Sequence, residues 1–513
     1  MITSSWNRPR RLAVGFAILA VGLAGIGPAA GAGIGDLAFD TIVFKNGGAE
    51  PGLAISPTGR VVMVAGLAGD VAPANLYRST DFGRSFKQIH PTFPQAGGYD
   101  FDMTFLDDHT IVAVDLALGS GFYVDRSTDD GDTWTTTQIN LDVYDRPWIA
   151  HYGKDLVYVV AKGFDGIPYL YRSSDGGRSF GSPPLPLIVY GIPGQGGPDP
   201  LNAFVYGGLN AYVDHLAVDQ KSGDVYVLYG LSSLSTFNPS QPLGVSNQLF
   251  VSHLEDDTMV SYPIHLGGAE ESAISGFNWM TVDPAGTVYA LMNGRKDGHH
   301  SARLSSSKDH GRTWSPLVDI APPGAANVYG SIAAGDPGVL SLVYLRGSVE
   351  DPSQDQLWYG EMARVTRADT ATPTVSHVRT TRKPIHSQDI CFDGILCGAP
   401  GFGENRDLLD FIWNEVSPNG KAFAVISSDG PATAFNPGGN PDVIILRQKA
   451  GPSHRSAAIP AATSKAKVRG TKQVKPRASL PATGVPGSPL AASVALWAAA
   501  LATAALLRRR LRA

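Results

Sequence analysis

Between about residues 33 and 448, short apolar runs alternate with turns rich in Asp, Pro and Gly. In residues 53–64, for example, an apolar run is followed by Ser-Pro-Thr-Gly and then by a second run rich in Val. Apolar, β-branched runs bounded by turn residues predict strands, so each such unit predicts two antiparallel strands. Seven units begin near Leu53, Met103, Trp148, Leu216, Met280, Ile332 and Val416. The body is therefore expected to be all-β.

An eight-residue pattern, Ser-x-Asp-x-Gly-x-(Ser/Thr)-(Trp/Phe), occurs four times, at residues 79–86, 127–134, 173–180 and 307–314. Asp accepts hydrogen bonds from nearby backbone N–H groups, Gly supplies the positive φ of a tight reversal, and the aromatic residue is a large apolar anchor. The pattern therefore predicts a hairpin turn with a structural role. It resembles the Asp-box, or bacterial neuraminidase repeat, of β-propeller proteins such as sialidases, in which the boxes lie on the face away from the active site.

The resemblance implies a β-propeller of four-stranded antiparallel blades, with the box joining the two outer strands. The first three boxes begin 48 and 46 residues apart, which is one blade each. The next interval, of 134 residues, contains one further strand pair and a Gly- and Pro-rich segment, residues 181–208, that we expect to be a long loop. The last repeat lacks an outer strand after residues 442–446, and residues 37–44 could supply it and close the ring. We expect seven blades; six, as in sialidase propellers, is the alternative.

Residues 1–32 have the three parts of a secretory signal peptide. Arg8, Arg10 and Arg11 precede an apolar stretch over residues 12–26, and residues 30–32, Ala-Gly-Ala, form a small-residue cleavage site. The alternative is an uncleaved membrane anchor. In both cases the body, residues 33–448, is expected outside the cell.

Residues 480–513 resemble the sorting signal of Gram-positive surface proteins. Residues 480–484 read Leu-Pro-Ala-Thr-Gly, and an apolar segment over about residues 489–507 precedes a basic tail. The apolar segment is long enough to span or nearly span a bilayer, and the arginines would hold the tail on the cytoplasmic side. The resemblance implies that a sortase cuts between Thr483 and Gly484 and joins Thr483 to peptidoglycan. A plain C-terminal membrane anchor is the alternative.

The net charge of −5 hides an uneven distribution. Residues 1–32 contain three basic residues and residues 449–513 contain twelve, with no acidic residue in either, so the body keeps 26 basic against 46 acidic residues. Such a body should not bind nucleic acid through a basic face. Residues 449–479, rich in Pro, Ala, Ser, Thr and basic residues, predict a disordered linker that crosses the cell wall.

Cys391 and Cys397 are the only cysteines. In a secreted chain such a pair predicts a small-loop disulfide, and it supplies too few ligands for a metal site. The sequence leaves open a structural cation in the channel and predicts no other cofactor.

Polar residues precede several of the predicted innermost strands. In sialidase-type propellers this position lies at the mouth of the central channel, where the ligand binds. The candidate ligand-binding residues are Asp145, Arg146, Trp148, Asp214, His215, Arg406, Asp407 and Asp410, and the candidate catalytic residues are Glu50, Asp100 and Asp102. A ring of carboxylates, arginines and a histidine suits a sugar or a cation, but the same residue types also cap strand ends.

Residues 45–430 resemble a broad group of secreted, sialidase-like repeat proteins, most of which have no established activity. The resemblance depends on Glu50-Pro51, on residues 145–148 and on the Cys391–Cys397 segment followed by residues 405–410. It implies fold and location more than reaction.

An exo-sialidase needs more than this group shares. Three arginines clamp the sialate carboxylate, a Tyr activated by a Glu is the nucleophile, and an Asp is the acid/base. Arg146 and Arg406 could be two clamp members, with Arg295 a poor third. No Tyr is marked as the nucleophile, and the usual Arg-Ile-Pro signature is missing.

The leading hypothesis is therefore a wall-displayed propeller that binds an extracellular ligand, first a glycan, at the channel mouth. The competing hypothesis is a glycosidase, with exo-α-sialidase first. The third is a protein-binding adhesin that uses the rim loops, above all residues 181–208.

Overall fold

The computed structural model describes most of the body of the chain. The described residues are 36–67, 74–94, 100–117, 121–139, 143–163, 167–181, 183–188, 209–233, 245–246, 248–266, 271–274, 277–392, 397, 405–408, 410, 412–429 and 441–456. All regular elements in these stretches are strands, as expected. No helix long and apolar enough to cross a membrane occurs among them.

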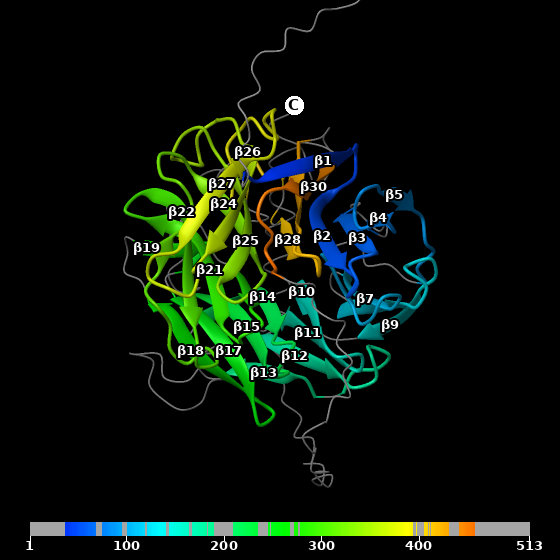
Figure 1. Cartoon of the computed structure of the whole chain (residues 1–513). Coiled ribbons are helices and arrows are strands. Elements are labelled where there is room, and N and C mark those ends of the chain that lie inside the picture. The colour runs from blue at the N-terminus through cyan, green and yellow to red at the C-terminus, as the bar shows by residue number, and fades with distance from the viewer. Residues whose placement is uncertain are drawn as a thin grey trace, which may run out of the picture.

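The strands form seven four-stranded antiparallel blades that follow one another around a ring (Figure 1). The first three blades, from the innermost strand outward, are β2 (Ala49–Ile55), β3 (Val62–Leu67), β4 (Asn75–Ser79) and β5 (Lys87–Ile89); β6 (Phe101–Phe105), β7 (Ile111–Ala117), β8 (Gly121–Ser127) and β9 (Thr135–Ile139); and β10 (Val143–Tyr152), β11 (Leu156–Gly163), β12 (Pro168–Ser173) and β13 (Leu185–Ile188).

The remaining blades are β14 (Leu209–Val218), β15 (Val225–Ser233), β17 (Gln248–Glu255) and β18 (Thr258–Leu266); β20 (Trp279–Val282), β21 (Val288–Lys296), β22 (His299–Ser307) and β23 (Val318–Asp319); β24 (Asn327–Ala334), β25 (Val339–Arg346), β26 (Tyr359–Thr366) and β27 (Thr374–Arg379); and β28 (Trp413–Val416), β29 (Ala422–Ser428), β30 (Asp442–Ala450) and β1 (Ala38–Phe44). Two short strands, β16 (Val245–Ser246) and β19 (Glu271–Ile274), extend the fifth blade at β21. The β-propeller fold and its seven blades are thus confirmed.

The ring closes between the two ends of the body. The N-terminal strand β1 pairs antiparallel with β30, from Phe44 opposite Val443 to Ala38 opposite Ala450, and so completes the seventh blade. Figure 1 shows β1, in blue, beside β30, in orange. The expected closure by residues 37–44 is confirmed.

Each box is the turn between the third and fourth strands of its blade. In the first box, Asp81 Oδ1 accepts hydrogen bonds from the backbone N–H groups of Arg84 and Ser85, at 3.0 and 2.9 Å, and Ser79 Oγ accepts one from Gly83 N at 2.9 Å. Gly83 has a φ of 73°, as the turn chemistry predicted. The residue before this glycine also has a positive φ in all four boxes, which the pattern did not reveal. The box is therefore closed by its own side chains.

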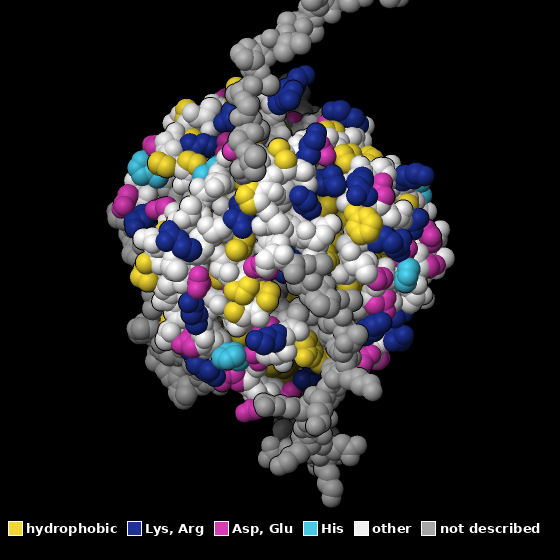
Figure 2. All heavy atoms as spheres, in the orientation of Figure 1, with side chains coloured by type: hydrophobic (Ala, Val, Ile, Leu, Met, Phe, Trp, Pro, Cys, Tyr) yellow, Lys and Arg dark blue, Asp and Glu magenta, His cyan; other side chains and the backbone are white. Residues whose placement is uncertain are grey.

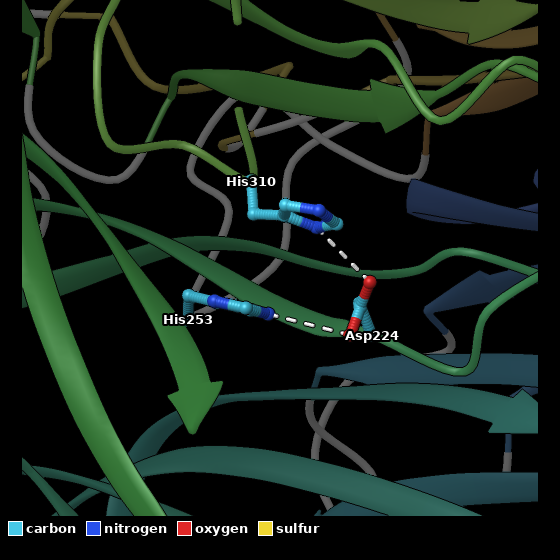
Figure 3. Close-up of side chains that lie close together, drawn as sticks. All are labelled: Asp224, His253 and His310. Atoms are coloured by element: carbon cyan, nitrogen blue, oxygen red, sulfur yellow. Dashed lines mark ion pairs between the residues drawn. The ribbon is translucent and has the colours of Figure 1, made fainter. Parts of the chain in front are cut away.

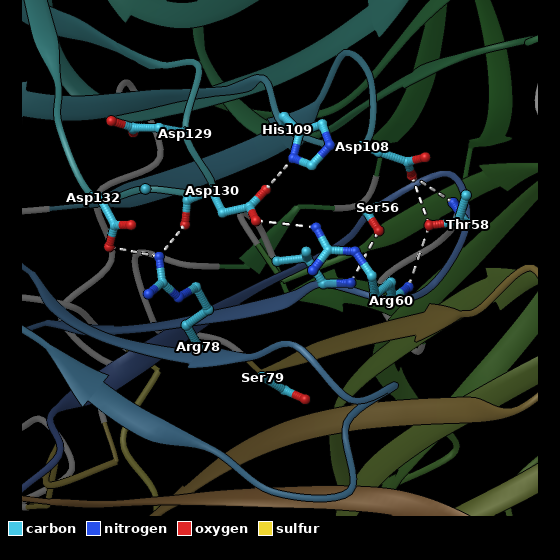
Figure 4. A network of polar contacts seen from close by, with 12 residues as sticks. Ser56, Thr58, Arg60, Arg78, Ser79, Asp108, His109, Asp129, Asp130 and Asp132 are labelled. Atoms are coloured by element: carbon cyan, nitrogen blue, oxygen red, sulfur yellow. Dashed lines mark hydrogen bonds and ion pairs between the residues drawn. The ribbon is translucent and has the colours of Figure 1, made fainter.

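The boxes also join neighbouring blades. Figure 4 shows Arg60 and Arg78 of the first blade reaching Asp130 and Asp132 of the second box. Arg60 NH2 lies 3.0 Å from Asp130 Oδ2, and Arg78 NH1 lies 2.7 Å from Asp132 Oδ1. The aromatic anchor Trp134 is buried between the same two blades. A box therefore stabilises its own hairpin and also the contact surface between two neighbouring blades, which we call a seam.

Segments of the chain differ from the expected organisation in two places. Residues 185–188, inside the expected long loop, form β13, which pairs in parallel with β18 and links the third and fourth blades. The rest of that loop lies outside the described residues. At the other end, His454 is buried and Arg455 NH2 donates to Ala334 O at 3.1 Å. The folded body thus continues to at least Ser456, beyond the expected boundary at 448.

The expected signal, most of the expected linker, and the sorting signal with Thr483 and Gly484 lie outside the described residues. The body itself carries both signs of charge on its surface. Figure 2 shows one face on which basic and acidic side chains intermingle.

Candidate active or binding site at the channel mouth

The register of the innermost strands places two rings of side chains around the channel. In every blade the strand pairing identifies a position equivalent to Leu53, which lies opposite Val64 on the second strand. The residues one position before it are Gly52, Asp102, Trp148, His215, Trp279, Ser331 and Trp413. Three positions before it stand Glu50, Asp100, Arg146, Phe277 and Tyr329, in five of the blades. We call the first set the inner ring and the second the mouth ring.

The inner ring fills the channel with aromatic side chains. The rings of Trp148, Trp279 and Trp413 have centroids 4.8–5.8 Å apart, and His215 lies 4.2 Å from Trp279. Burial lowers the pKa of His215 to about 3, so its imidazole is neutral at physiological pH. Trp148 and His215, expected to bind ligand, thus pack in the channel below the mouth.

Two of the candidate acids hold backbone groups of the next blade. Asp102 Oδ2 accepts the backbone N–H of Ile149 at 2.8 Å. Asp214 Oδ1 accepts the backbone N–H and the side-chain amide of Asn278, each at 3.1 Å. Asp102 and Asp214 are only 2% and 1% exposed. The geometry therefore assigns Asp102 and Asp214 to blade-to-blade contacts.

The mouth ring meets Arg406 and Asp410, which come from the segment before β28. Asp410 binds two arginines: Arg406 Nε and NH2 approach its two carboxylate oxygens at 3.1 and 2.6 Å, and Arg146 NH2 lies 2.8 Å from its Oδ2. The Asp410 backbone N–H donates to Glu50 Oε1 at 3.1 Å. We call Glu50, Asp100, Arg146, Tyr329, Arg406 and Asp410 the mouth cluster.

Asp100 and Asp145 flank Arg146 in this cluster. Asp100 Oδ2 accepts the backbone N–H of Arg146 at 3.0 Å. Asp145 Oδ1 lies 3.9 Å from Arg146 Nε, and the Asp145 side chain is 30% exposed. The structure thus brings together Glu50, Asp100, Asp145, Arg146, Arg406 and Asp410 of the residues expected from the sequence.

Tyr329 and Phe277 also belong to the mouth and were missed in the sequence. The Tyr329 ring lies 5.2 Å from Phe277, whose ring is 5.0 Å from the Arg146 guanidinium. A signal for Tyr329 does exist: it stands three residues before Ile332, as Glu50 stands before Leu53 and Arg146 before Ile149.

Backbone strain is concentrated in this cluster. Glu50, Arg146 and Tyr329 have φ values of 45°, 48° and 55°, in the left-handed region that non-glycine residues seldom adopt. At each of them the innermost strand has a register shift. Strained residues of this kind cost of the order of 1–3 kcal/mol each and gather at functional sites. The three strained residues therefore mark one site.

The charges in the cluster divide into two kinds. Although burial opposes ionisation, Arg406 and Arg146 hold the pKa of Asp410 below its usual value, so Asp410 is an anion. Burial, followed by the charges of Asp100 and Asp410, raises the pKa of Glu50 well above its usual value. Burial and the charge of Asp145 raise the pKa of Asp100 to about 6. Two carboxyl groups whose pKa values differ can act as an acid and a base, respectively.

Asp407 lies beside the mouth, next to the disulfide segment. The expected bond between Cys391 and Cys397 is present, and the Cys391 N–H donates to Asn405 O at 2.8 Å. Asp407 Oδ2 accepts a hydrogen bond from Asn405 Nδ2 at 2.9 Å. A backbone hydrogen bond thus connects Cys391 to the residue before Arg406.

Arg295 does not complete a clamp of three arginines. Arg295 is exposed on β21. Burial, followed by the charge of Arg295, lowers the pKa of His300. The charged groups that act on Tyr329 are Asp410, Arg406, Arg146 and Glu50. Among the described residues, two arginines therefore converge on the mouth cluster, and both bind Asp410.

Comparisons with known proteins identify no family. No family model and no curated protein matches the chain. Similar solved structures include a protein of unknown function from Dyadobacter fermentans, with 14% identity, a TM-score of 0.42, and coverage of 80% of this chain and 98% of that one. They also include an α-L-arabinanase from Penicillium chrysogenum, with 12% identity, a TM-score of 0.40, and coverage of 61% and 93%. Function is therefore inferred from the chain's own residues.

Proposed function

We propose that the chain is a cell-surface β-propeller that binds an extracellular glycan at the mouth cluster. The observation that carries this proposal is the convergence of three strained residues, Glu50, Arg146 and Tyr329, from three separate blades on one polar cluster. Strained residues gather at functional sites, and these three also stand at register shifts of the innermost strands.

The chemistry of the accessible edge of the cluster suits a sugar. Arg406 and Asp145 keep 25% and 30% of their side-chain surface exposed, whereas Arg146 and Asp410 keep 8% and 10%. An arginine donor and a carboxylate acceptor can each bind a hydroxyl of a sugar. The buried Asp410 helps to hold Arg406 in place, because it also bonds to Arg146 and Glu50.

The small volume of the cavity below the mouth cluster favours binding over catalysis. The cavity between the inner ring and the mouth cluster, lined by Phe277, Trp279, Tyr329, Gly330, Asp410 and Ile412, has a volume of about 10 Å³. This volume holds about one water molecule. A sugar would therefore contact the cluster from outside, at Arg406 and Asp145.

A glycan array with the purified protein tests the proposal. We expect at least one glycan to bind, and Arg406→Gln to weaken binding by about 10-fold or more, because a charge-assisted hydrogen bond is lost. Arg382→Gln, at an exposed arginine after β27, is the matched control and should bind as the parent does. No binding by folded protein, or equal binding by Arg406→Gln, would contradict the proposal.

A sialidase-type glycosidase is the second candidate, and Tyr329 is the observation that favours it. Tyr329 is 4% exposed, and Glu50 and both arginines of the cluster act on its pKa. A Tyr beside a Glu is the nucleophile pair that such an enzyme needs. Turnover of a fluorogenic sialoside that is lost in Tyr329→Phe would establish this activity, and no turnover by the folded parent would reject it.

Attachment to the cell wall is the proposal for location, and its support is the sorting-type signal at residues 480–484 together with the apolar segment and basic tail. In a Gram-positive host with a sortase, we expect cell-wall digestion to release the parent protein. Thr483→Ala should remain in the membrane fraction or the medium, whereas Thr463→Ala, in the linker, should be released like the parent. Equal wall attachment of all three proteins would refute the sorting role.

A further inference from the structure

An arginine recurs at the seams between blades, on the face that carries the boxes. It stands on the third strand of a blade, and its guanidinium donates to the backbone carbonyl of the residue before the box glycine in the next blade. The three examples are Arg447 Nε to Phe82 O at 3.4 Å, Arg78 NH1 to Asp130 O at 3.0 Å, and Arg126 Nε to Gly176 O at 3.1 Å.

The seam between the fourth and fifth blades departs from this rule. His253 of β17 stands opposite Tyr226, as Arg78 stands opposite Met63, so a histidine replaces the arginine. The residue before the glycine of the fifth-blade box is His310. Their imidazole rings are stacked, with centroids 5.6 Å apart and planes 16° apart. Two imidazoles therefore meet where the three other seams that contain a box use a cation and a carbonyl.

A carboxylate completes the group. Asp224, in the turn between β14 and β15, places Oδ1 3.5 Å from His253 Nε2 and Oδ2 3.1 Å from His310 Nδ1. Figure 3 shows both imidazoles directed at the two oxygens of this carboxylate. One candidate ligand atom from each residue lies within 4.8 Å of the others. Tetrahedral ligands at about 2.0–2.2 Å from a zinc ion lie a little over 3 Å apart, so small shifts suffice.

The Nε2 atom of His253, which faces Asp224, is a candidate metal ligand. His253 is 6% exposed, and its Nε2 is buried and makes no hydrogen bond. Its other nitrogen, Nδ1, lies 3.2 Å from Glu255 Oε1. A carboxylate that holds one imidazole nitrogen fixes the tautomer and leaves the other nitrogen free for a metal. Glu255 is held in turn by Tyr262 and Arg312, at 2.8 and 2.9 Å.

The group can also be reached from solvent. The side chains of His310 and Asp224 are 50% and 27% exposed. A second cluster, His386 with Asp407 and Asp429, differs on this point. There His386 is fully buried, and its two nitrogens are occupied by Asp429 and by the Asp389 carbonyl. The first group alone combines an open edge with an imidazole nitrogen that has no hydrogen bond.

We propose that Asp224, His253 and His310 bind a divalent transition-metal ion, Zn²⁺ first, and that the ion clamps the seam between the fourth and fifth blades. Two imidazoles and one carboxylate suit zinc, with water in the fourth position. The fourth blade has a tight turn at Asp256-Asp257 in place of a box, and this turn faces the third blade, where Asp257 pairs with Arg172. The site lies on the box face, away from the mouth cluster, so it is independent of glycan binding.

The test uses the full chain, purified in mild detergent with a tag that contains no histidine and then stripped with a chelator. ZnCl₂ is titrated by calorimetry, and the thermal unfolding midpoint is measured with and without the ion. We expect one Zn²⁺ per chain and a higher midpoint with zinc, because an ion that binds only the folded state stabilises it. His310→Asn, chosen because Asn tolerates positive φ, should abolish both effects, and Asp224→Asn should do the same.

Two further variants separate a metal site from a structural seam. Glu255→Gln should bind Zn²⁺ about 10- to 100-fold more weakly, as loss of such a second carboxylate usually does. His299→Asn should bind like the parent. His299 is an exposed histidine that pairs with a carboxylate, Glu350, but it belongs to no group of three candidate ligands among the described residues. Folding of each variant is checked in chelator by its unfolding midpoint. If the parent takes up no Zn²⁺, or if folded His310→Asn binds it equally, the group is an ion-paired seam only.

Discussion

At the scale of single residues, the same residue type serves different ends according to its place on the innermost strand. Asp100 stands in the mouth ring beside Arg146, whereas Asp102, two residues later, holds the backbone N–H of Ile149. Both lie at the start of the same innermost strand, β6, so the sequence assigned them to one site. What separates them is the exact layer of the channel that each reaches, which depends on strand register.

The arginines of the mouth cluster should differ in their effect on stability. Arg146→Met leaves the buried Asp410 carboxylate with one arginine partner, so we expect a loss of about 3–5 kcal/mol in the free energy of unfolding. Arg406→Met should cost less, because the Arg406 side chain is 25% exposed against 8% for Arg146. Denaturant unfolding of both variants measures the difference. The reverse order would mean that Arg146 is not the buried partner on which Asp410 depends.

The box aspartates should stabilise the fold most above pH 4. Hydrogen bonds from Thr313 lower the pKa of Asp309 to about 2, below the value of about 3.9 for an unfolded Asp. Its stabilising contribution is therefore complete above pH 4 and is lost as the pH falls to about 2.

We expect Asp309→Asn to cost about 1 kcal/mol at pH 7, where the parent has its charge-assisted hydrogen bonds, and less at pH 3. Unfolding midpoints at the two pH values measure this change. Asp297→Asn, in the exposed turn between β21 and β22, is the control. A cost for Asp309→Asn that is equal at both pH values would argue against the role of the ionised carboxylate.

At the scale of elements, each innermost strand sets its own two ring positions, because successive side chains of a strand point to opposite faces. Alternation and turn chemistry are local, which is why the strand pairs at Leu53, Leu216 and Met280 could be predicted. The register shifts near Glu50, Arg146 and Tyr329 are not local, since they depend on the partner strand. These register shifts place the three residues at the channel mouth.

The closing strand β1 gives a matched pair of substitutions. Ile42 is partly buried and packs against the main core, whereas the next residue, Val43, is 44% exposed. We expect Ile42→Asp to destabilise the ring by about 2–4 kcal/mol, because it places an unpaired charge against apolar neighbours. Val43→Asp should change stability by less than about 0.5 kcal/mol. Thermal unfolding of the two variants tests this, and similar losses in both would contradict the register of β1.

At the scale of the whole molecule, closure of the ring brings distant segments together. Asp410 is 264 residues from Arg146 and 360 residues from Glu50 along the chain, yet it bonds to both. Arg406 and Asp410 lie between β27 and β28, outside the blade strands, and the hydrogen bond from Cys391 N–H to Asn405 O connects this segment to the disulfide. The site is thus a property of the closed ring and of this one added segment.

Removing the disulfide should therefore affect binding more than the blades. Because the loop from Cys391 to Cys397 is short, we expect the double serine variant to lose about 2 kcal/mol. The β-sheet signal in circular dichroism should remain, while glycan binding falls with the looser Arg406. Binding equal to the parent would show that the disulfide does not position the mouth cluster.

The chain's own sequence determined the all-β fold, the box turns, the ring closure and the disulfide. The strands and the box turns follow from short patterns whose physical cause is local: alternation of side chains, positive φ at glycine, and hydrogen bonds within eight residues. The ring closure was predicted from an unpaired strand at each end of the body, and the disulfide from the single pair of cysteines. Tertiary structure alone decided that Trp148 and His215 fill the channel, and it brought Tyr329 together with Glu50 and Arg146. It also decided that His253 meets His310 across a seam. These contacts join separate blades, and no local pattern records which blades become neighbours in layer and register.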